Sequence, residues 1–259
     1  MASWMVHLRI ADRLLDSLPQ LSAVDFVVGN IAPDSGIPNE DWSEFTPSVI
    51  VSHFRVDHSI PKNICIPAFV ERYFTRLQRT SYSPAQNSFF LGYLVHLLTD
   101  QLWSAKVLTA LMERFPDQWQ ADRQRLIQRA KTDWYDLDYK YLRQHPDFRA
   151  FRIYSGAVGY QNVFMREFAP DAFDNRRQYI TSFYLEENHH LDREYPYLTE
   201  GQMDGFVTSA CAEILSRLET EYGIYSKTRL LLDKGGGFLY NLGEFRLNIK
   251  EKRMKQWSN

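Results

Sequence analysis

The sequence predicts an all-α protein, a single multi-helix bundle around one buried helix at about residues 84–114. Helical periodicity runs through most of the chain, and the alternation and turn signals of β-hairpins are nearly absent. The third observation is the segment Phe89–Trp103, FFLGYLVHLLTDQLW, which is apolar on nearly every face. A helix that is apolar all round belongs in the middle of a domain. We therefore expect the few polar side chains of this segment to be buried.

The other elements follow from periodicity and from helix-ending residues. Ser3 is a residue type that caps helices, and apolar positions recur at helical spacing after it as far as about residue 18. The stretch 33–62 contains prolines and few periodic positions, which predicts a long ordered loop. At the C-terminal end, Gly235–Tyr240 is the one place that suits a short β-hairpin. Further helices are expected over residues 23–30, 67–79, 116–141, 171–190 and 201–222.

Composition limits the class of protein. A chain of 259 residues without a Gly/Ser/Pro-rich linker predicts one large domain, residues 1–259. The net charge of -2, with both signs interspersed, leaves no basic field for duplex nucleic acid outside the short tail Lys250–Lys255. Cys65 and Cys211 lack ligand spacing, which favours reduced thiols in a cytoplasmic protein. We expect no secretory signal at the charge-interrupted start and no transmembrane segment, because no run reaches about 18 uncharged apolar residues.

His96 and Asp100 are the polar residues of the predicted central helix that carry chemistry. They are four residues apart, so their side chains share one helix face with Cβ atoms about 6 Å apart, close enough to bind one ion together. An ionised aspartate in an apolar helix costs several kcal/mol unless a cation or several donors compensate. A divalent metal would compensate directly. A hydrogen-bonded pair of His96 and Asp100 is the alternative that the spacing leaves open.

Three further residues combine a metal-ligand side chain with a setting that does not require one. His7 lies on the apolar stripe of the first helix, Asp34 follows a proline in GNIAPDSG, and His53 lies between apolar residues in the predicted loop. Each has an ordinary interpretation as well. These are a core histidine, an aspartate that stabilises a turn, and a surface or hydrogen-bonded histidine.

Taken in order, His7, Asp34, His53 and the pair His96-xxx-Asp100 resemble the bacterial zinc-dependent phospholipase C family, whose all-helical fold also occurs in fungal single-strand-specific nucleases. The resemblance covers about residues 4–106. It implies one metal surrounded by Asp34, His53, His96 and Asp100, and a second held by His7 and the bridging Asp100. Mixed histidine and carboxylate ligation suits zinc, with manganese and iron as alternatives.

The sequence also departs from that family. Secreted members use the α-amine of a processed N-terminal tryptophan as a ligand, whereas Trp4 is internal here. The family's histidine beyond the central aspartate and its later HxxxE, which complete a third metal site, are missing. Asp133 and Asp136, three apart in DWYDLDY, are second candidates for metal ligands. Their alternative interpretation is a solvated acidic helix face.

These residues predict a metal-dependent hydrolase acting on a phosphoester, a phospholipase C-like phosphodiesterase with Asp34 or a metal-bound water as general base. A soluble small-molecule phosphoester is as admissible a substrate as a lipid, because no membrane-docking amphipathic face is evident. The first alternative is a non-catalytic helical protein that metal ions stabilise and whose active site is partly lost. The second is a metal-free scaffold with an internal His/Asp hydrogen-bond network.

Overall fold

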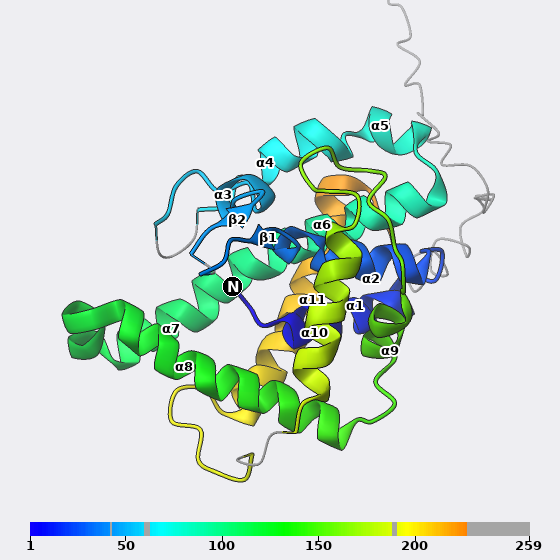
Figure 1. Ribbon diagram of the computed structural model, residues 1–259. Helices are drawn as coiled ribbons and strands as arrows, with labels where there is room; N and C mark the ends of the chain where they lie inside the picture. The colour runs from blue at the N-terminus through cyan, green and yellow to red at the C-terminus, as the bar shows by residue number, and fades with distance from the viewer. Residues whose placement is uncertain (42, 60–62, 188–190, 227–259) are drawn as a thin grey trace, which may run out of the picture.

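The computed structural model describes residues 1–41, 43–59, 63–187 and 191–226, and it confirms the all-α class (Figure 1). The C-terminal hairpin expected over Gly235–Tyr240 lies outside these residues. In the described part of the chain, no helix combines the length and apolar character needed to cross a membrane.

The helices are, in chain order, α1 (Trp4–Ser17), α2 (Ala23–Ile31), α3 (Val49–Ser52), α4 (Ile66–Phe69), α5 (Arg76–Ser81), α6 (Pro84–Trp103), α7 (Thr109–Arg114), α8 (Pro116–Gln144), α9 (Arg149–Gly156), α10 (Ala172–Leu185) and α11 (Glu200–Tyr222). Three short helical segments of other pitch connect some of them: η1 (Ala32–Asp34), η2 (Val70–Phe74) and η3 (Ser104–Leu108). Of these, η1 is a 3₁₀ helix, and η2 and η3 are π-helical.

The predicted central helix is confirmed as α6, which continues through the π-helical η3 into α7 and so spans residues 84–114. Its side chains are buried almost without interruption from Ser88 to Trp103. The helices α1, α2, α4 and α11 all contact it. His96, Thr99 and Asp100 are therefore buried polar groups, as the apolar sequence around them predicts.

Two glycines allow α2 and α6 to approach closely. A Cβ atom at Gly92 would lie 2.1 Å from the carbonyl oxygen of Phe26, and one at Gly29 would lie 2.1 Å from the carbonyl oxygen of Phe89. Both distances are far below van der Waals contact, so only glycine fits at either position. The close approach places the C-terminal end of α2 against the middle of α6, where His96 lies.

The stretch 33–62 is more structured than the predicted loop. It contains η1, the helix α3 and a two-stranded antiparallel sheet of β1 (Ile37–Pro38) and β2 (Phe45–Thr46), with Ile37 opposite Thr46. Strands of two residues are too short to give a periodic signal, which explains why the sequence did not predict them.

Two other predictions of helices needed correction. The helix expected over 67–79 is interrupted at Thr75, whose extended backbone starts α5 with a capping box formed with Gln78. The segment between α8 and α10, which no helical pattern marked, contains α9. Ser3 precedes α1 as expected, but its side chain makes no capping hydrogen bond. The Ser3 hydroxyl instead donates to Asp138 on α8, over 2.8 Å.

Candidate metal centre

The five predicted ligands come from four separate parts of the chain and meet beside α6. His7 lies on α1, Asp34 ends η1 directly after α2, His53 follows the last residue of α3, and His96 and Asp100 lie one turn apart on α6. All five side chains are at most 5% exposed. The structure thus brings together residues as far apart in sequence as His7 and Asp100.

The ligand atoms form two overlapping groups, in each of which they lie within 4.8 Å of one another. One group contains His7, His96 and Asp100, and the other contains Asp34, His53 and His96. His96 is common to both groups. Asp100 nevertheless faces both, because its Oδ1 lies 3.7 Å from Nε2 of His7 and its Oδ2 lies 3.9 Å from Nε2 of His53.

The spacing around His53 matches what a small tetrahedral ion requires. Its Nε2 is 3.2 Å from Oδ1 of Asp34 and 3.3 Å from Nε2 of His96. Ligand atoms at about 2.0–2.1 Å from a tetrahedral zinc ion lie about 3.3 Å from one another. Nε2 of His53 is therefore at the separation of metal ligands from both Asp34 and His96.

A backbone carbonyl determines the tautomer of His96. Nδ1 of His96 is 2.7 Å from the carbonyl oxygen of Asn30, which can only accept a hydrogen bond, so Nδ1 must carry the proton. Nε2 then has a free lone pair and points at His53. Metal-binding histidines typically have this arrangement, in which the second nitrogen donates to a carbonyl and the first remains available to the ion. The two nitrogens of His96 thus face the Asn30 carbonyl and His53.

His7 provides an independent test of whether an ion fits. Its ring stacks on that of His96 with a centroid distance of 3.8 Å and an interplanar angle of 1°. Both of its ring nitrogens are buried and lack a hydrogen-bond partner. Leaving a buried polar atom without a partner costs about 1–3 kcal/mol. A cation between His7 and Asp100 would give one of these nitrogens, Nε2, a partner, so the residues present fit a bound metal.

The protonation states also suit ligation. Burial, reinforced by the neighbouring His7, holds the pKa of His96 well below its ordinary value, against the opposing effect of Asp34 and Asp100. Burial alone would raise the pKa of Asp34, but its hydrogen bond with His53 and the surrounding imidazoles outweigh burial and lower that pKa. At neutral pH, His96 is therefore a neutral imidazole and Asp34 a carboxylate, the forms that bind metal ions.

The second candidates, Asp133 and Asp136, have another partner. Arg193 places one nitrogen 2.7 Å from Asp133 and another 2.6 Å from Asp136, and Asp133 also accepts the backbone N–H of Tyr197. These contacts attach the segment after α10 to α8, and neither carboxylate belongs to the two ligand groups. We therefore interpret the pair as a structural ion-pair site.

Asp138, the third aspartate of DWYDLDY, is buried like Asp133. It is 1% exposed and accepts hydrogen bonds from Ser3 and Tyr184. Its position four residues after the buried Trp134 was the available signal, because both side chains lie on one face of α8.

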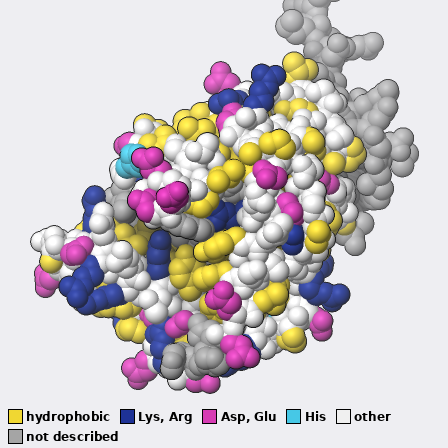
Figure 2. All heavy atoms as spheres, viewed as in Figure 1, with side chains coloured by type: hydrophobic (Ala, Val, Ile, Leu, Met, Phe, Trp, Pro, Cys, Tyr) yellow, Lys and Arg dark blue, Asp and Glu magenta, His cyan; other side chains and the backbone are white. Residues whose placement is uncertain are grey.

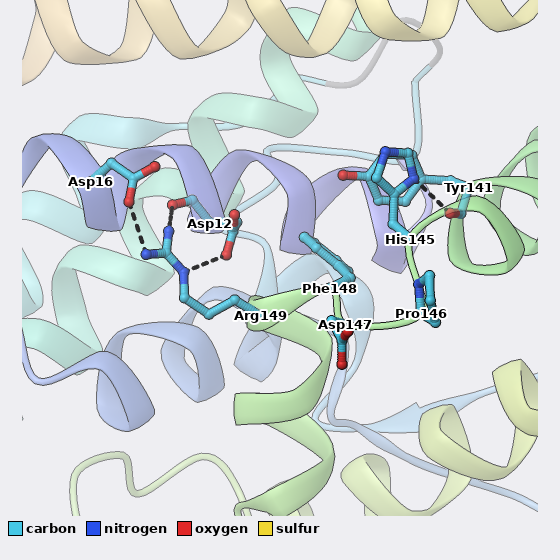
Figure 3. A pocket seen from close by; sticks show the side chains of 8 residues that line it. All are labelled: Asp12, Asp16, Tyr141, His145, Pro146, Asp147, Phe148 and Arg149. Carbon is cyan, nitrogen blue, oxygen red and sulfur yellow. Dashed lines mark hydrogen bonds and ion pairs between the residues drawn. The ribbon is translucent and has the colours of Figure 1, made fainter.

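Two surface hollows lie elsewhere. One, of about 480 Å³, is lined by residues from the end of α1 and from the α8–α9 junction, where Arg149 is paired with Asp12 and Asp16 (Figure 3). Another, of about 250 Å³, lies between the α6–α7 region and the start of α11. None of the five ligands lines either hollow. Figure 2 shows hydrophobic side chains gathered near the middle of the viewed face, between α10 and the arm formed by α7 and the start of α8.

The chain matches no protein-family model, no curated protein and no solved structure. The resemblance to the zinc-dependent phospholipase C family therefore depends on the residues His7, Asp34, His53, His96 and Asp100 alone.

Proposed function

We propose that this protein is a metal-dependent hydrolase of phosphoesters whose centre is formed by His7, Asp34, His53, His96 and Asp100. The observation that carries the proposal is the convergence of three imidazoles and two carboxylates in the buried interior, with both nitrogens of His7 lacking a hydrogen-bond partner. Zinc suits this donor set best, and manganese or iron are alternatives. A divalent ion held there would polarise a phosphoryl oxygen and lower the pKa of water.

The chain's own residues supply orientation and a proton acceptor. The Asn30 carbonyl and the stacked ring of His7 fix the imidazole of His96. The Ser52 hydroxyl, 2.9 Å from Nδ1 of His53, holds the second ring. Asp34 is the least enclosed of the five residues, and its hydrogen bond with His53 and its imidazole neighbours keep it ionised against the opposing effect of burial. We assign to its carboxylate the acceptance of a proton from the attacking water, a role worth typically 10²–10⁴-fold in rate.

The test measures metal content and turnover in the same preparations. Elemental analysis of protein purified without added metal should find zinc, manganese or iron at one or two ions per chain. Hydrolysis of bis(p-nitrophenyl) phosphate should exceed that of Asp100→Ala, and Asp34→Asn, assayed at saturating metal, should lose at least 100-fold. Asp133→Asn is the matched control, because it removes a carboxylate that pairs with Arg193. Turnover equal to that of Asp100→Ala would refute the hydrolase.

A second candidate function has one observation in its favour. All five ligand side chains are nearly inaccessible to solvent, and neither hollow reaches them. Structural zinc sites are closed in this way, whereas catalytic sites keep a position open to water. The alternative is therefore a non-catalytic helical protein in which metal ions tie α1, α2, α3 and α6 together. Full metal occupancy with no turnover, together with loss of stability on chelation, would favour it.

A further inference from the structure

We propose that Asp138 is a positioning residue for the ligand Asp100, and that it acts through the N-terminal segment Ala2–Trp4. The inference rests on the proposed metal function. It concerns a buried acid outside the five-residue ligand set, on a different helix from any of those ligands.

Asp138 has two hydroxyl partners in the interior. Its Oδ1 accepts from the Ser3 hydroxyl over 2.8 Å, and its Oδ2 accepts from the Tyr184 hydroxyl over 2.7 Å. The Tyr184 oxygen in turn lies 3.3 Å from the backbone N–H of Met5. Asp138 therefore ties the chain on both sides of Trp4 to α8 and α10.

Aromatic packing also holds this segment. The ring of Trp4 lies edge-on to those of Tyr179, Phe183 and Tyr184, with centroid distances of 5.9, 5.7 and 6.3 Å. Edge-to-face contacts of this kind are favourable, so they hold the segment against α10.

The segment also contacts a ligand of the metal centre directly. The backbone N–H of Ala2 donates to Oδ1 of Asp100 over 2.9 Å. Holding Oδ1 restricts rotation of the carboxylate and leaves Oδ2 facing His53. Partners of metal ligands that act in this way typically change metal affinity by 10–100-fold when they are removed. Replacing Ala2 by proline would remove this N–H but would also constrain the backbone of the segment, so the effect is tested at Asp138.

The experiment compares Asp138→Ala with Asp136→Ala, a matched variant two residues away on the same helix whose carboxylate contacts Arg193. Zinc affinity is measured by competition with a chelator, and ligand geometry by the visible absorption spectrum of the cobalt-substituted protein. We expect Asp138→Ala to bind zinc at least tenfold more weakly and to change the cobalt spectrum. Asp136→Ala should unfold more easily yet keep the affinity and spectrum of the wild type.

Two further variants keep the test decisive if Asp138→Ala folds poorly. Asp138→Asn can still accept a hydrogen bond from one hydroxyl and donate to the other, so its zinc affinity should stay within threefold of wild type. Ser3→Ala removes only the link between the segment and Asp138, and should weaken zinc binding several-fold. Amide exchange of residues 2–7, followed by NMR, should become faster in Ser3→Ala and in Asp138→Ala.

The outcomes separate the inference from the function on which it rests. A wild-type protein that binds neither zinc nor cobalt overturns both. Metal binding by wild type with unchanged affinity and spectrum in Asp138→Ala and Ser3→Ala overturns the inference alone. Weaker binding with unchanged amide exchange of residues 2–7 also overturns it, because the effect would then not pass through the N-terminal segment.

Discussion

Replacing Gly92 by alanine tests whether the close approach of α2 and α6 builds the metal centre. The added Cβ would lie 2.1 Å from the carbonyl oxygen of Phe26 and 2.7 Å from the backbone nitrogen of Asn30. Both atoms belong to the backbone of α2, so no side-chain rotation relieves the clash. An ordinary contact needs about 3.4 Å or more, and α2 must therefore move outward by about 1 Å.

The expected cost follows from that displacement. Overpacking a core typically costs about 1–3 kcal/mol, and a clash against backbone at both atoms puts Gly92→Ala at or above the top of that range. The same movement would lengthen the hydrogen bond between the Asn30 carbonyl and His96, now 2.7 Å, so zinc affinity should fall as well. Urea denaturation measures the first effect and chelator competition the second.

Gly205→Ala is the matched control. Gly205 lies within α11, and a Cβ atom there would meet nothing within 4 Å. Alanine is the better helix former, so this variant should be more stable than wild type by about 0.5–1 kcal/mol with unchanged zinc affinity. If Gly92→Ala proved as stable as Gly205→Ala, the proposed contact between α2 and α6 would be wrong.

Three more predictions concern residues outside that contact. Burial raises the pKa of Asp138 from 3.8 to about 7 against the hydrogen bonds from its partners, so the folded state keeps a proton that the unfolded chain releases. The free energy of unfolding should therefore fall by up to about 4 kcal/mol from pH 4 to pH 7 and level off above. In a pH series of urea denaturations, Asp138→Asn should abolish this fall in the free energy of unfolding. A profile identical to that of wild type would contradict the prediction. Burial also raises the pKa of Cys211 to about 11, so iodoacetamide at pH 8 should label the more accessible Cys65 first, as peptide mass spectrometry would show; equal labelling would refute this. Thr199→Ala removes the capping box of α11 and should cost about 1 kcal/mol in thermal unfolding, with no change in zinc affinity.

Much of the fold was predictable because periodicity reports burial. The segment around His96 is apolar on all faces, and this alone placed α6 at the centre and its polar residues in the interior. Periodicity does not reveal a helix break caused by one extended residue, such as Thr75. It does not reveal strands of two residues, such as β1, either. These depend on local hydrogen bonds and on contacts distant in sequence.

The sequence predicted some residues of the site but not their contacts. His7, Asp34 and His53 were selected because each is a ligand-type residue in an apolar or turn setting, and the structure does place all three beside α6. Asp133 and Asp136 were selected by spacing alone, which could not foresee Arg193 sixty residues later in the chain. The contact of Asp138 with Ser3 spans an even longer separation, and no local pattern encodes it.

The C-terminal end of α2 shows why fold and site cannot vary independently here. The last carbonyls of a helix have no partners within it and must find donors elsewhere. The carbonyl of Asn30, in the last turn of α2, accepts a hydrogen bond from Nδ1–H of His96. This hydrogen bond leaves Nε2 unprotonated and facing His53. The donor reaches that carbonyl only because glycines at positions 29 and 92 let the two helices approach. One hydrogen bond thus gives a carbonyl at the end of α2 its partner and also sets the tautomer of a proposed metal ligand. Any change that separates α2 from α6 should therefore weaken folding and metal binding together.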